Sequence, residues 1–104
     1  MNIVVRLGKA FMVALAVHLF LTEISFIIYT INNEGGLTPC GMVNVMKDGV
    51  DSFYLNLILL LSVAVAISAA ILGVHKHLFK WSILLLLFDV TFGILIPIFT
   101  FTFC

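Results

Sequence analysis

Charge is scarce in this sequence. Only 10% of its 104 residues are charged, and five acidic side chains balance five basic ones. With no net charge, no global field draws the chain to nucleic acid, so any basic surface has to be local. Metal-finger spacing, a phosphate-binding loop and a glycine-rich dinucleotide fingerprint are also missing. A chain this short has no room for a separate catalytic domain. We therefore expect a protein that is not an enzyme and that uses no metal or cofactor.

Hydrophobic residues are abundant instead, at 63% of the chain, which excludes an ordinary soluble domain. Three apolar runs, residues 8–31, 53–74 and 81–103, each have roughly the 20 residues that cross a hydrocarbon core. In lipid the backbone must satisfy its own hydrogen bonds, so each run is expected to be helical. We predict an all-α membrane protein with residues 1–104 in one domain. Its three long helices would include a hairpin over residues 53–103 bent at a basic corner.

The first apolar run follows a short basic start, a pattern that also fits a secretory leader. Cleavage of such a leader would make the mature chain begin near Asn32. No convincing A-x-A site follows the run, so we expect residues 8–31 to be retained as a helix.

The only polar stretch spans residues 32–52. Thr38 followed by Pro39 suits an N-cap and first helical position, which predicts a short helix over residues 39–47 that ends near Gly49. We expect this helix to lie on the membrane surface through four apolar side chains: Met42, Val43, Val45 and Met46.

Four of the five basic residues, Arg6, Lys9, Lys76 and Lys80, fall on one side of the three spans. The positive-inside rule then places the N-terminus in the cytoplasm and residues 32–52 outside. Cys40 and Cys104 both fall on the outer side, where a disulfide can persist. Two free thiols are the alternative, but we predict a disulfide, either within one chain or between subunits.

The corner at residues 75–80 reads HKHLFK. Two histidines, His75 and His77, do not make a metal site by themselves. With Lys76 and Lys80 they would anchor the turn at the lipid headgroups. If many copies assembled with this corner facing a lumen, the same residues would instead form a basic ring.

Three ionisable residues, His18, Glu23 and Asp89, lie within the apolar runs, where charge is costly. His18 and Asp89 are each nine residues from the basic edge of their span, so at the same depth we predict a contact between them. That contact would be a buried polar clasp or part of a proton relay. Glu23 has no evident basic partner and would be neutral.

Small or polar residues form a stripe on each span. The stripes are Ala14, His18, Thr22, Ser25 and Tyr29; Ser62, Ala66, Ala70 and Gly73; and Asp89, Gly93 and Pro97. Such faces let helices approach closely, within one chain or between subunits. Three helices of this size can hardly bury all three stripes themselves, which favours a homo-oligomer.

From residue 49 onward, several features occur in a familiar order. GVDSF opens a helix rich in small residues, HKHLFK forms a corner, and a second apolar helix runs to the C-terminus. This half of the chain resembles the conjugative pilins of type IV secretion systems, the F-pilus and T-pilus kind. The long first helix departs from that pattern and better suits a divergent or archaeal relative.

The resemblance implies a subunit stored in the cytoplasmic membrane and extracted with phospholipid, or archaeal lipid, into a hollow extracellular homopolymer. His75, Lys76, His77 and Lys80 would line its lumen, through which single-stranded DNA would pass. Secretion-system membrane components would be further partners. The alternatives are a small accessory membrane protein, an immunity protein against a bacteriocin, and a holin-like pore.

Overall fold

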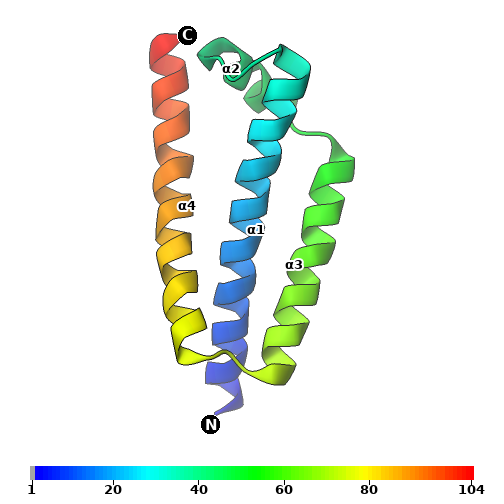
Figure 1. The fold of residues 1–104 in the computed structure, drawn as a ribbon, viewed down its shortest axis with the longest axis vertical. Helices are drawn as coiled ribbons and strands as arrows, with labels where there is room; N and C mark the ends of the chain where they lie inside the picture. The colour runs from blue at the N-terminus through cyan, green and yellow to red at the C-terminus, as the bar shows by residue number, and fades with distance from the viewer. Residues whose placement is uncertain (1) are drawn as a thin grey trace.

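The computed structural model describes residues 2–104, which fold into four helices (Figure 1). These are α1 (Ile3–Glu34), α2 (Pro39–Asp48), α3 (Ser52–Leu72) and α4 (Lys76–Phe103). Three of them, α1, α3 and α4, are long and apolar enough to cross a membrane. The prediction of an all-α protein with three long apolar helices is therefore confirmed.

Side-chain caps set several helix ends. The Asn2 side chain accepts a hydrogen bond from the Val4 N–H at 3.0 Å, and Thr38 Oγ1 accepts one from the Gly41 N–H at 3.1 Å. At the other end of α1, Gly35 adopts a φ of 74°, a left-handed conformation that glycine adopts at little cost. The 32 residues of α1 span about 48 Å, so the helix extends well beyond the expected residues 8–31.

The corner is shorter than the sequence suggested. Only residues 73–75 connect α3 to α4, and His75 caps α4 by accepting a hydrogen bond from the His77 N–H at 3.2 Å. Lys76 and Lys80 thus belong to the first turns of α4, five residues before the expected start at 81. The difference has a simple reason. Hydropathy marks where a segment becomes apolar, whereas a capped helix continues through polar residues.

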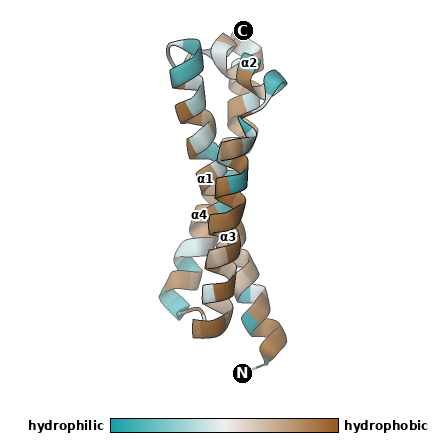
Figure 2. Cartoon of the chain, turned by 90° about the vertical axis from the view of Figure 1, so that its right-hand side faces the viewer, coloured by the Kyte–Doolittle hydropathy of each residue, from teal (hydrophilic) through white to brown (hydrophobic). Residues whose placement is uncertain are grey.

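The three long helices form one flat layer with α1 in the middle. Figure 1 shows α4 and α3 on opposite sides of α1, and Figure 2 shows the same layer from its edge. The Cα atoms extend 50 × 26 × 17 Å. Helix α1 packs against both neighbours, but no Cα atom of α3 comes within 8 Å of one in α4 among residues 2–104. Residues 53–103 therefore form a hairpin whose two helices do not pack on each other, because α1 lies between them.

Helix α2 lies across the ends of α1 and α4, opposite the N-terminus (Figure 1). Met42, Val43 and Val45 are buried there, so the expected position on the membrane surface is wrong for most of its apolar face. A Cβ atom at Gly41 would stand 2.9 Å from the Glu34 Cβ, and only glycine permits this approach of α2 to α1. Protein, rather than lipid, covers this helix.

The buried core is small, and half of its apolar members lie in the first half of α1. Its members there are mostly short side chains: Ala10, Val13, Ala14 and Ala16. Small residues allow neighbouring helices to approach closely. Large apolar side chains are exposed along all three long helices. Figure 2 shows that hydrophobic residues make up most of each of these helices. Such an outer surface is typical of a membrane protein.

Candidate functional site

Four polar residues of the spans, His18, Glu23, Ser62 and Asp89, lie along the two interfaces of α1, which we call the α1–α3 seam and the α1–α4 seam. On the α1–α3 seam, His18 Nδ1 lies 3.1 Å from Ser62 Oγ. The Ser62 hydroxyl donates its proton to the Ile58 carbonyl at 2.8 Å. Because a hydroxyl has only one proton, His18 Nδ1–H is the donor in the first bond. This assigns the tautomer and leaves Nε2 without a proton when the ring is neutral.

Small side chains surround this bond. Ser62 is buried, and Ala66 of α3 faces Ala14 of α1 along a groove of about 240 Å³ that His18 also lines. Farther along the seam, the rings of Tyr29 and Tyr54 meet edge to face, with centroids 6.3 Å apart. The small-residue stripe of α3 is thus used within the chain. Its other members, Ala70 and Gly73, are half-buried on the same side.

The α1–α4 seam contains two carboxyl groups. Asp89 is only 2% exposed, and the group that faces its carboxyl is the carboxyl of Glu23. Neither Asp89 oxygen has a hydrogen-bond donor within residues 2–104 when both groups are ionised. One turn farther along α4, a Cβ atom at Gly93 would lie 3.7 Å from Glu23 Oε1. The Glu23 side chain therefore lies against this turn of α4.

The predicted contact between His18 and Asp89 is absent, because His18 bonds Ser62 and Asp89 faces Glu23. Asp89 lies level with Glu23, which is five residues farther along α1 than His18. His18 and Glu23 are five positions apart on α1, which places them about 140° apart around the helix axis. They therefore face α3 and α4, which lie on opposite sides of α1.

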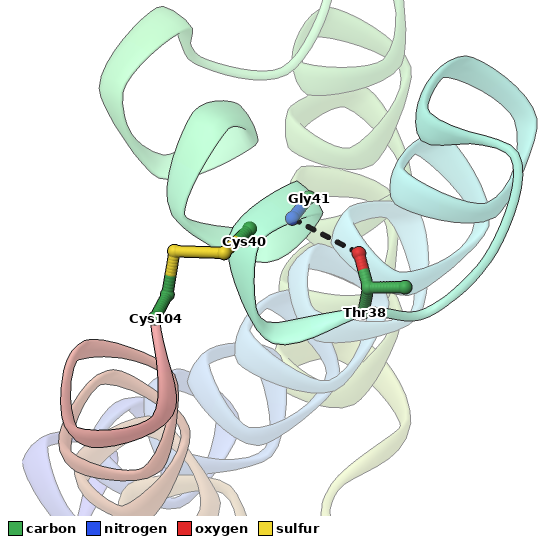
Figure 3. The surroundings of a disulfide bond; sticks show 4 residues. All are labelled: Thr38, Cys40, Gly41 and Cys104. Carbon is green, nitrogen blue, oxygen red and sulfur yellow. Dashed lines mark hydrogen bonds between the residues drawn. A yellow bond between two sulfur atoms is a disulfide. The ribbon is translucent and has the colours of Figure 1, made fainter.

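A disulfide joins α2 to α4 at the end of the molecule opposite the N-terminus (Figure 3). Cys40, in the first turn of α2, bonds Cys104 with a Cα–Cα distance of 5.1 Å. The Gly41 N–H next to it donates to Thr38 Oγ1, so the capped first turn of α2 presents Cys40 to the end of α4. The bond lies within one chain and closes a loop over a sequence separation of 64.

Basic residues gather at the other end, which we call the basic end. Arg6 donates a hydrogen bond to the Ile71 carbonyl in the last turn of α3, and Lys9 Nζ lies 5.4 Å from the centroid of the Phe79 ring. The proposed lumen residues, His75, Lys76, His77 and Lys80, are all exposed here. Sequence reasoning did not find that Arg6 caps α3, because no local pattern links positions 65 residues apart.

Metal chemistry finds no support in the described part of the chain, residues 2–104. No group of three or more His, Cys, Asp or Glu side chains in it could hold a metal ion. No protein-family model, curated protein or solved structure matches this chain.

Proposed function

We propose that this small three-span membrane protein is a structural subunit that assembles with copies of itself. The main support for this proposal is the incomplete burial of α1. Every residue of α1 from position 17 to position 27 is half-buried, and none is fully buried, although this stretch includes His18, Thr22 and Glu23. A flat layer covers its central helix along two edges only. His18 and Glu23 each face one neighbouring helix and are still only half-buried, so a neighbouring subunit on an open face of α1 would complete their burial in lipid.

The specific assembly that we propose is the hollow DNA-transfer filament implied by the resemblance to conjugative pilins. Two features support it. The exposed Lys76, His77 and Lys80 at the basic end would supply the lumen with positive charge, which attracts a polyanion. The disulfide at the opposite end suits an oxidising exterior. In the membrane-resident form the N-terminus and the basic end would face the cytoplasm, where positively charged flanks accumulate.

The test is the state of the full chain in cells and after purification. Sheared surface material and the membrane fraction are imaged by negative stain, and the detergent-solubilised protein is weighed by native mass spectrometry. Filaments that contain this chain support the pilin function. Discrete homo-oligomers without filaments would retain the structural role but overturn the pilin form. A protein that remains monomeric in membranes and in mild detergent would overturn self-assembly and favour an accessory or immunity protein.

The orientation has its own measurement. Both native cysteines are in the disulfide, so His77→Cys introduces a single reactive thiol at the exposed basic end. We expect a membrane-impermeant thiol reagent to label this variant only after the cells are opened. Asn44→Cys, on the exposed side of α2, is the matched control that should be labelled in intact cells. The reverse pattern would invert the topology.

A further inference from the structure

The two carboxyl groups of the α1–α4 seam lack the partners that charged groups need. Asp89 is 98% buried, with both oxygens free of any donor in residues 2–104. Glu23 faces it from α1. Basic groups do not reach this place from any helix that packs here. His18, the one basic residue of α1 beyond Lys9, is bonded to Ser62 on the other seam, and α4 has no basic residue after Lys80. The only basic residue of α2, Lys47, is exposed.

Two ionised carboxylates in this position would be unstable for two reasons. Each would lose its hydration without gaining a donor, and their negative charges would repel each other at short range. A single proton removes both problems, because a protonated carboxyl donates a hydrogen bond that a carboxylate accepts. A second proton makes the pair neutral, which is the form that hydrocarbon tolerates best. The charge of the pair therefore changes from −2 to −1 to 0 as protons bind.

We propose that Glu23 and Asp89 form a proton-binding site within the membrane-spanning layer, in which an O–H of one carboxyl donates to an oxygen of the other. The site lies between α1 and α4 of a single chain, so it does not require self-assembly. Glu23 Oε1 lies beside Gly93, one turn along α4 from Asp89, so the two carboxyl groups meet at the same level of the seam. Proton binding would also hold α1 against α4, since the shared hydrogen bond connects the two helices.

A hydrophobic carbodiimide tests the site directly, because it adds to a protonated carboxyl in an apolar environment and increases the protein mass by that of the whole reagent. Purified full-length protein in lipid vesicles is treated with dicyclohexylcarbodiimide and analysed by intact-mass and peptide mass spectrometry. We expect an adduct at Glu23 or Asp89. Its rate of formation should fall about tenfold per pH unit once the pH is high enough to remove the proton.

Matched variants identify the site. Glu23→Gln and Asp89→Asn together should abolish the adduct, while each retains the size and hydrogen-bonding capacity of the original side chain. Glu34→Gln, which changes an exposed carboxyl at the end of α1, should leave the adduct unchanged. The decisive labelling uses the unaltered chain, so the test stands even if a variant fails to fold.

Two results would overturn the proposal. The first is no adduct at either residue at any pH, which would mean that both carboxyls are ionised or face water. The second is protection by sodium: if Na⁺ slows labelling relative to choline at equal ionic strength and fixed pH, the pair binds a metal cation instead of a proton.

Discussion

The two seams of α1 differ in how their polar side chains are paired. On the α1–α3 seam, His18 and Ser62 form a hydrogen bond among small side chains. On the α1–α4 seam, two acidic groups, Glu23 and Asp89, meet with no donor between them unless a proton is present. The first seam is complete as it stands. The second seam needs a proton from solution, and this difference makes it the candidate for function.

The seams also differ in how their ends are held. The disulfide joins α4 to α2, and α2 packs on both α1 and α4. A covalent bond therefore holds one end of the α1–α4 seam together. The α1–α3 seam is held at its ends by noncovalent contacts only, the Arg6 cap on Ile71 and the Tyr29–Tyr54 pair. Thus the seam that contains unpaired acids is the one with the covalent tie. A tie of this kind keeps two helices together when repulsion between them changes with protonation.

The largest effect is expected from opening the disulfide. In the loop-entropy treatment, closing a loop of this length stabilises a chain by about 4 kcal/mol. Helices that stay inserted in lipid restrict the unfolded chain already, so this value is an upper bound here. We expect reduction, Cys40→Ser and Cys104→Ser each to lower the unfolding free energy in mixed micelles by a similar amount. Reduction of either variant should have no additional effect. An oxidised preparation with two free thiols by mass spectrometry would contradict the structure.

An intermediate effect is expected from Asp89→Ala, which removes one acid of the α1–α4 seam. The unfolding free energy should fall by about 1–2 kcal/mol, the scale of polar contacts between membrane helices. The comparison of the seams is tested by two double-mutant cycles. Asp89→Ala combined with Glu23→Ala should be non-additive, whereas Asp89→Ala combined with His18→Ala should be additive. Coupling to His18 but not to Glu23 would reverse the assignment of partners.

The sequence was sufficient to predict the helices but not their arrangement. Apolar length indicated three spans, and Thr38 with Pro39 indicated the start of α2. The order of the helices in the layer depends on which stripes face each other, and three stripes of similar character permit several arrangements. Helical periodicity does contain one usable signal. Since His18 and Glu23 are about 140° apart around α1, one neighbouring helix could not have contacted both.

The buried and unpaired state of Asp89 could not be read from the sequence for a related reason. The position of Asp89 along its span follows from counting residues, but its partner depends on how α4 is rotated about its own axis. The disulfide was easier to predict, because a chain with two cysteines on the same side of the spans allows few other pairings. Long-range contacts of single side chains, such as Arg6 with the Ile71 carbonyl, leave no local pattern at all.

The smallest effect is expected from the His18–Ser62 bond, which makes it the most sensitive test of the difference between the seams. Hydrogen bonds between membrane helices couple their partners by about 0.6 kcal/mol on average, because the separated helices find other partners. We therefore expect His18→Ala and Ser62→Ala to show a coupling of about this size in mixed-micelle unfolding. Ser68→Ala, on the exposed face of the same helix, is the matched control and should show no coupling to His18. Because His18 and the two acids lie on separate seams, His18→Ala should leave the carbodiimide labelling of the acids unchanged. If His18→Ala altered the pH at which that labelling declines, the two seams would form one network and the separation between them would be wrong.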